Sequence, residues 1–193
     1  MPRSFLRILS TIVLLTTSNM SDAFAQADPS RSDKVNTQLE RLLSPHAVVV
    51  DRTILQSGQG SQEIRLRLPG NPALAQPSGT QQPASLTILQ RVTKGRPMAR
   101  LRSLDLAPDT LLAVAVDAQK KLRSWAVIPD PRIIRAESPG PDGVLRGRIL
   151  TVDQPEFSIT IPNDSSIVEV RLFEPRWTGR EFVLTHIARV EIK

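Results

Sequence analysis

Arginines set two positions apart are the side chains whose type and spacing point most directly to chemistry in this sequence. Of the 25 basic residues in the 193-residue chain, 20 are arginines. Three pairs share this spacing: Arg65 and Arg67, Arg100 and Arg102, and Arg146 and Arg148. In a β-strand it places both guanidinium groups on one face. Because a guanidinium binds carboxylate, phosphate and sulfate groups bidentately, neighbouring strands of this kind would bind an acidic protein, a polyanionic glycan or an anionic lipid surface.

The alternative interpretation of these arginines is a solvated outer face. On such a face they would pair with nearby carboxylates, of which Glu63, Glu169 and Glu174 are examples. Exposed ion pairs of that kind contribute little to stability. The choice between the two interpretations depends on whether the arginine strands are neighbours in one sheet.

A further candidate contact lies at Arg176 and Trp177, just before the turn residues Thr178 and Gly179. An exposed tryptophan can stack on a sugar ring. A tryptophan that folds back over a sheet instead packs against a neighbouring side chain, often a guanidinium. Arg176 and Trp177 therefore join the three arginine pairs as candidate binding residues.

Nucleic acid is excluded as a partner, although the sequence pI is about 10.7 and the formal net charge is +6. Sheets that bind single-stranded nucleic acid stack bases on exposed aromatic rings that lie between basic side chains. This chain has no tyrosine, and the alternation around Phe157 and Phe182 predicts buried positions for both rings. The basic charge is therefore assigned to other acidic partners.

Signatures of catalysis and metal binding are sparse. The chain has no cysteine and only two histidines, His46 and His186, with no clustered carboxylate pattern around them. A histidine on an apolar strand face is usually a packed, neutral ring. We therefore predict no catalytic residue, no metal site and no cofactor. The alternative is a secreted hydrolase that uses His186 or two carboxylates in a cleft.

The first 25 residues have the layout of a secretory signal peptide. Arg3 and Arg7 supply the positive start, 8–15 is an apolar run, and Ala23-Phe24-Ala25 fits a small-residue cleavage site. The apolar run is too short for a bilayer-spanning helix. The sequence therefore predicts export to the periplasm or the outside, with no membrane-spanning segment after cleavage.

The chain changes from a helical to a strand period near residue 45. Residues 26–44 are predicted as a flexible or short helical lead-in, because Val35, Leu39 and Leu43 follow helical spacing before Pro45. Apolar and polar residues then alternate, as in strands with one buried face. The predicted strands span 46–55, 63–68, 86–92, 98–106, 111–116, 122–128, 132–137, 144–151, 156–161, 168–172 and 182–192.

Two of these strands carry specific expectations about their faces. In the final strand, one buried face is predicted to hold Phe182, Leu184, Ala188, Val190 and Ile192. In the strand at 168–172, Val168, Val170 and Leu172 are predicted to be buried, whereas Glu169 and Arg171 face water.

Many short strands without intervening helices predict an all-β protein, an antiparallel β-sandwich over residues 45–193. Its general layout resembles immunoglobulin-like and fibronectin-like sandwiches, a likeness of architecture that carries no functional residues. The proline- and glycine-rich segment at 138–143 is an alternative internal boundary. The predicted function is non-catalytic binding after export. A structural subunit that assembles through an unpaired edge strand is a further alternative.

Overall fold

The computed structural model describes residues 29–51, 60–70, 82–96, 98 and 103–192. The predicted signal peptide lies outside these ranges, as do Arg100 and Arg102 and large parts of the strands predicted at 46–55 and 98–106. The prediction that His46 begins a strand is wrong, because this residue ends a 3-10 helix, η1 (Ser44–His46). Pro45 lies in the first turn of η1, and Ala47 turns the chain with a φ of 54°.

The described chain forms one α-helix and ten strands. Their bounds are α1 (Pro29–Leu43), β1 (Ser61–Arg67), β2 (Ala84–Ser85), β3 (Thr87–Lys94), β4 (Thr110–Asp117), β5 (Leu122–Pro129), β6 (Ile133–Pro139), β7 (Leu145–Thr151), β8 (Glu156–Pro162), β9 (Ile167–Trp177) and β10 (Phe182–Glu191). Helix α1 occupies most of the lead-in predicted at 26–44 and begins at Pro29, a residue type whose fixed φ suits the first helical turn.

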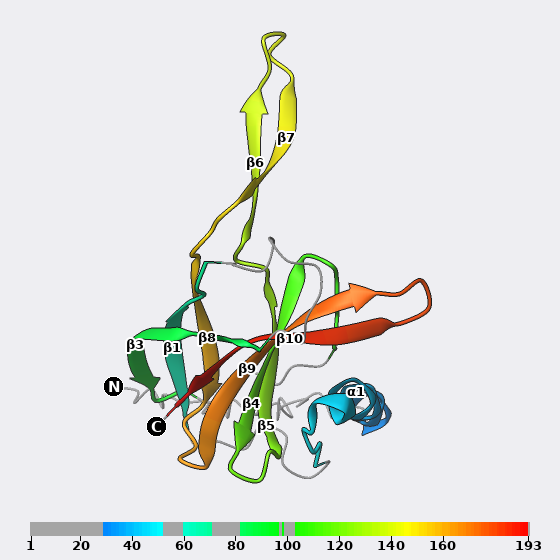
Figure 1. The fold of residues 1–193 in the computed structure, drawn as a ribbon, viewed down its shortest axis with the longest axis vertical. Helices are drawn as coiled ribbons and strands as arrows, with labels where there is room; N and C mark the ends of the chain where they lie inside the picture. The colour runs from blue at the N-terminus through cyan, green and yellow to red at the C-terminus, as the bar shows by residue number, and fades with distance from the viewer. Residues whose placement is uncertain (1–28, 52–59, 71–81, 97, 99–102, 193) are drawn as a thin grey trace, which may run out of the picture.

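Two sheets and a separate hairpin account for these strands (Figure 1). The order in the larger sheet is β2-β10-β9-β4-β5, and in the smaller sheet it is β3-β1-β8. Within the described part of the chain, strands β6 and β7 pair only with each other. All pairings are antiparallel except the short one between β2 and β10. The structure therefore confirms the all-β prediction and is compatible with a sandwich.

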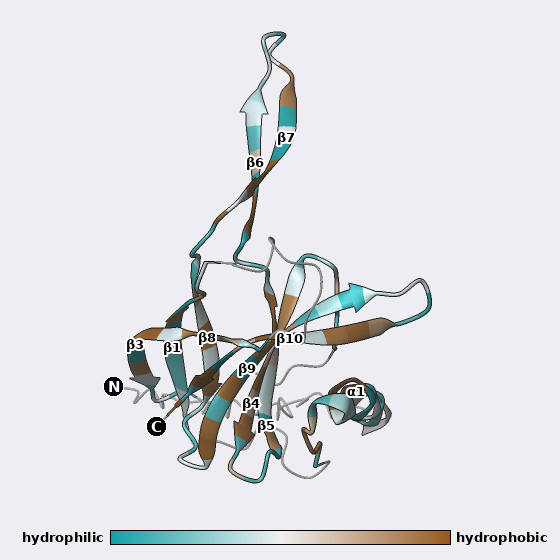
Figure 2. Ribbon diagram, viewed as in Figure 1, coloured by the Kyte–Doolittle hydropathy of each residue, from teal (hydrophilic) through white to brown (hydrophobic). Residues whose placement is uncertain are grey.

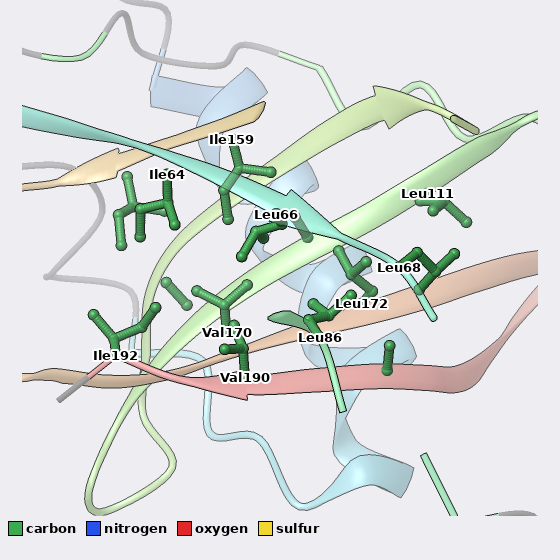
Figure 3. Packing of buried hydrophobic residues seen from close by; sticks show 14 of the residues in the cluster. Ile64, Leu66, Leu68, Leu86, Leu111, Ile159, Val170, Leu172, Val190 and Ile192 are labelled. Atoms are coloured by element: carbon green, nitrogen blue, oxygen red, sulfur yellow. The ribbon is translucent and has the colours of Figure 1, made fainter. Parts of the chain in front are cut away.

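The first hydrophobic core lies between the two sheets (Figure 3). Ile64 and Leu66 of β1 are fully buried there, opposite Val170 and Leu172 of β9. These are the inward faces that the alternation predicts, because successive strand residues point to opposite sides of a sheet.

A second core lies on the opposite face of the larger sheet, where α1 covers it. Leu39 and Leu43 of the helix pack with Val114 of β4, Trp125 of β5 and Phe173 of β9. Their four-residue spacing places both leucines on the same side of α1. The larger sheet is therefore buried on both faces, with the smaller sheet on one side and α1 on the other.

A β-bulge in β10 divides the apolar residues of that strand between the two cores. The pairing of β10 with β9 shifts between His186 and Ala188, leaving Ile187 as the extra residue. Leu184 therefore packs in the second core, whereas Ala188 and Val190 pack in the first. The prediction that Phe182, Leu184, Ala188, Val190 and Ile192 share one face is wrong for this reason.

Candidate functional site

The structure places two of the three predicted arginine pairs on strands that are not neighbours, while Arg100 and Arg102 lie outside the described residues. Arg65 and Arg67 lie on β1, between β3 and β8. Arg146 and Arg148 lie on β7, which pairs only with β6. The described residues therefore do not join these two pairs into one continuous ladder.

On β1 the guanidinium groups are matched by a carboxylate of the neighbouring strand. Glu156 of β8 lies 2.8 Å from Arg65 and 2.5 Å from Arg67. The hydrogen bond from Arg67 and the positive charges of both arginines lower the pKa of Glu156. On the same strand Glu63 pairs with Lys94 of β3. This surface therefore matches the interpretation of a solvated, internally paired face.

Arg176 and Trp177 lie near the outer end of β9, beside β10. Arg176 Nη2 is 3.7 Å from a carboxylate oxygen of Glu174. The ring centroid of Trp177 lies 5.1 Å from that of Phe182, its cross-strand partner, in an edge-to-face arrangement. The indole of Trp177 therefore packs against β10, and because 56% of the residue remains exposed, the rest of its surface is accessible to solvent.

Both histidines pack against Phe173 on the face of the larger sheet beneath η1. The ring centroid of Phe173 lies 4.8 Å from that of His46 and 5.0 Å from that of His186. Each histidine Nε2 lies 3.1 Å from a backbone carbonyl oxygen, that of Leu184 for His46 and that of Ala188 for His186. Burial lowers the pKa of both rings. Both histidines are therefore packed rings whose Nε2 atoms are hydrogen-bonded to backbone carbonyl oxygens.

An ion pair beneath η1 corrects the predicted exposure of Arg171. This residue is only 9% exposed, and its Nη2 lies 2.9 Å from a carboxylate oxygen of Glu169. Arg171 Nη1 also donates a hydrogen bond to the backbone carbonyl of His46. The prediction of a wet face is wrong here because α1 and η1 cover this side of the sheet.

The β6–β7 hairpin is the part of the described chain that stands away from both sheets (Figure 1). Every residue of β7 is exposed, including Leu145 at 62% and Ile149 at 70%. The turn at its tip is closed by a hydrogen bond from Gly140 N–H to Val144 O and by Gly143, whose φ is 73°. The proline- and glycine-rich segment at 138–143 therefore forms the end of this arm.

A buried ion-pair network holds the base of the arm. Asp130 accepts hydrogen bonds from the guanidinium and backbone N–H of Arg132. Arg132 Nη2 also lies 3.4 Å from Glu174 of β9. The hydrogen bonds that Arg132 donates to Asp130, together with the negative charges of Asp130 and Glu174, raise the pKa of Arg132. The network therefore ties the start of β6 to the larger sheet, while Arg135 makes an exposed ion pair with Asp109.

The register of the hairpin distributes side chains over its two faces. Figure 2 shows hydrophilic and apolar residues interspersed along β6 and β7. Cross-strand partners share a face, so one face holds Ile133, Arg135, Glu137, Pro139, Leu145, Gly147, Ile149 and Thr151. The other face holds Ile134, Ala136, Ser138, Arg146, Arg148 and Leu150. Both faces therefore combine apolar and charged side chains, and neither packs on a sheet.

Sequence reasoning predicted both strands of this arm but not its separation from the sandwich. The sequence does indicate that this arm is separate from the sandwich, because β7 lacks a regular alternation of apolar residues. In β7, Ile149 and Leu150 are consecutive, and Gly147 interrupts the face shared by Leu145 and Ile149. A strand packed on a core over one face needs apolar residues at alternate positions. The absence of such a face indicates that β7 is not a layer of the sandwich.

We also searched for a metal site, for a membrane-spanning helix and for similar proteins. Within the described ranges, no three histidine or carboxylate side chains gather closely enough to hold a metal ion. No helix in the described part of the chain has the length and apolar character needed to cross a membrane. The chain matches no family model, no curated protein and no solved structure.

Proposed function

We propose that the protein is an exported, non-catalytic β-sandwich that binds an acidic protein partner through the β6–β7 hairpin. Export by the signal peptide at residues 1–25 and an immunoglobulin-like or fibronectin-like general layout are part of this proposal. The observation that carries it is the exposure of the whole β7 strand on an arm outside both sheets.

The energetics of the arm support a role in binding. A two-stranded hairpin without a third strand or a covering layer is at best marginally stable in water. Here Ile134, Leu145, Ile149 and Leu150 are all exposed on it. Apolar side chains that gather on a surface mark interaction sites, because covering them removes apolar area from water.

The charges of the arm favour an acidic partner. Arg146 pairs with Asp142 at 3.0 Å, an exposed contact that a partner's carboxylate can replace. Arg148 has no ion-pair partner among the residues that the structure describes. Two guanidinium groups on one strand face can therefore bind carboxylates of a partner.

Among acidic partners, a protein fits the arm better than the other two classes. Glu137 and Asp142 lie near the tip, where an anionic lipid surface would repel them. A polyanionic glycan supplies charge but little apolar surface to cover Leu145 and Ile149. A protein surface supplies both carboxylates and apolar side chains.

The test compares two variants that each lose two arginines. Arg146→Gln with Arg148→Gln changes the arm, and Arg65→Gln with Arg67→Gln changes β1 as the matched control. Each is used to capture partners from envelope extract at low and high salt. We expect the arm variant to lose a salt-sensitive protein partner that the control retains. Equal loss by both variants, or equal binding of heparin and anionic vesicles in place of a protein, would contradict the proposal.

The export part is tested by expressing the full chain in a bacterium and fractionating the cells. We expect a periplasmic protein whose N-terminus, read by mass spectrometry, begins shortly after Ala25. A cytoplasmic protein that keeps residues 1–25 would contradict this part while leaving the binding role intact.

A further inference from the structure

Among the described residues, no strand pairs with the outer edge of β7, and the backbone hydrogen-bonding groups along that edge have no backbone partner. Gly140 N–H donates to Val144 O, and Val152 N–H donates to Arg132 O. Because the register between these two contacts is regular, the even-numbered residues form the hydrogen-bonded pairs. The N–H and C=O groups of the odd-numbered residues therefore point outward, on β7 those of Leu145, Gly147, Ile149 and Thr151.

The opposite edge of the hairpin is less complete. On β6, Pro139 has no N–H, and the N–H of Ile133 already donates to Asp130 O. Only Arg135 and Glu137 keep outward amides there. Proteins protect exposed edges with proline, a bulge or charged side chains, lysine above all. Strand β7 has no proline, lysine or bulge, and its charges are the arginines Arg146 and Arg148. The outer edge of β7 is therefore the better template for another strand.

We propose that the outer edge of β7 accepts an extended segment of the acidic partner as a third strand of the hairpin. This inference rests on the proposed function and names the way in which the partner binds. The added strand would use the outward N–H and C=O groups for affinity, and its side chains would supply specificity. A third strand also gives the hairpin the extra pairing that it lacks.

The side chains beside this edge define the sequence that would fit. Arg146 and Arg148 lie on one face and select carboxylates two positions apart in the added strand. Leu145 and Ile149 lie on the other face and select apolar residues between and beside those carboxylates. The partner segment therefore alternates acidic and apolar residues.

A second copy of the chain fits this edge less well than an acidic segment does. Antiparallel pairing of β7 with itself about Gly147 places Arg146 of one copy opposite Arg148 of the other. Like charges directly opposite each other destabilise a strand pair. An acidic segment can approach β7 closely at Gly147, in the middle of the strand, because a Cβ atom built on this residue would meet nothing within 4 Å.

The probe is the peptide Thr-Val-Val-Glu-Val-Glu-Val, and its matched control has lysine at both glutamate positions. Binding to the full chain is followed by NMR, through shifts and hydrogen exchange of the backbone amides of β7. We expect the glutamate peptide to slow the exchange of the Gly147 and Ile149 amides, and the lysine peptide to leave it unchanged. Equal binding of both peptides, or shifts confined to another surface, would overturn the inference.

Substitutions of Gly147 separate strand addition from other modes of binding. Gly147→Pro removes an outward N–H, whereas Gly147→Ala keeps it and fills open space. We expect at least about tenfold weaker peptide binding for the proline variant and little change for the alanine variant. If partner capture depends on Arg146 and Arg148 but not on the Gly147 amide, the binding role stands and strand addition is wrong.

Discussion

His46 of η1 lies directly on Phe173 of β9, with their ring centroids 4.8 Å apart. The same phenyl ring also contacts His186, with the ring centroids 5.0 Å apart, and Arg171 donates a hydrogen bond to the backbone carbonyl of His46. This cluster attaches the η1 turn, and with it helix α1, to the larger sheet. Its two titratable rings lie in an environment that already holds one buried positive charge.

We expect the protein to lose stability on mild acidification. Burial is the largest cause that lowers the pKa of His46 and His186 in the folded state, and the charge of Arg171 adds to it. The backbone hydrogen bond of each ring opposes this shift, as does Glu169 at His186, without reversing it. The unfolded chain, with a histidine pKa near 6.5, therefore binds these protons more tightly than the folded protein. The histidine contribution is complete above that value and falls as the pH drops through it. Urea unfolding between about pH 7.5 and pH 5 measures the slope.

The control for this pH dependence is the double variant His46→Gln with His186→Gln. Glutamine can still donate a hydrogen bond but does not titrate. We expect the free energy of unfolding of this variant to change less over the same pH range. An unchanged slope would show that other groups cause the acid sensitivity.

Arg171→Met tests the buried ion pair beneath η1. The substitution leaves the carboxylate of Glu169, which is mostly buried, without its partner. We expect a loss of about 3 kcal/mol in the free energy of unfolding. Adding Glu169→Leu to Arg171→Met should recover part of that loss, because the uncompensated charge is then removed. A double variant that is less stable than Arg171→Met would contradict this account.

Arg132→Gln tests how the arm is held. In this variant Asp130 would remain buried but would lose the guanidinium group that neutralises its charge. The ion pair between residue 132 and Glu174 would also be lost. We expect a loss of about 3 kcal/mol in stability, together with faster amide exchange in β6 and β7. The control is Arg135→Gln, which breaks an exposed ion pair with Asp109 and should cost less than about 1 kcal/mol. Equal effects of the two variants would contradict the assignment.

Glu156→Gln tests whether ion pairing neutralises the arginines on β1. The variant frees Arg65 and Arg67 from their shared carboxylate, so we expect stronger retention on a heparin column. It should leave capture of the acidic partner by the arm unchanged. Unchanged retention on heparin would mean that the arginines of β1 are already available in the native protein.

Sequence patterns predicted those strands that have one buried face. Ile64 and Leu66 alternate with arginines, and both lie in the first core. The same logic fails at Arg171, because an alternating pattern does not report that a helix from an earlier segment covers the second face. In β4, consecutive apolar residues such as Leu112 and Ala113 are the signal that both faces are buried.

Two features of the candidate site and its scaffold are not encoded in local patterns. The bulge at Ile187 changes the facing of the residues that follow it, although apolar residues occupy even-numbered positions both before the bulge, at 182 and 184, and after it, at 188, 190 and 192. The pairing of Arg65 and Arg67 with Glu156 joins residues about ninety positions apart. Local spacing identified the arginines, but their availability depends on which strands become neighbours.

The bulge in β10 also affects how the protein unfolds. Because Leu184 belongs to the second core and Ala188 and Val190 belong to the first, one continuous strand contributes to both. Detaching β10 therefore removes side chains from both hydrophobic layers in a single event. Neither layer can open around this strand without weakening the other, so we expect the two sheets and α1 to lose their structure together, as one cooperative unit.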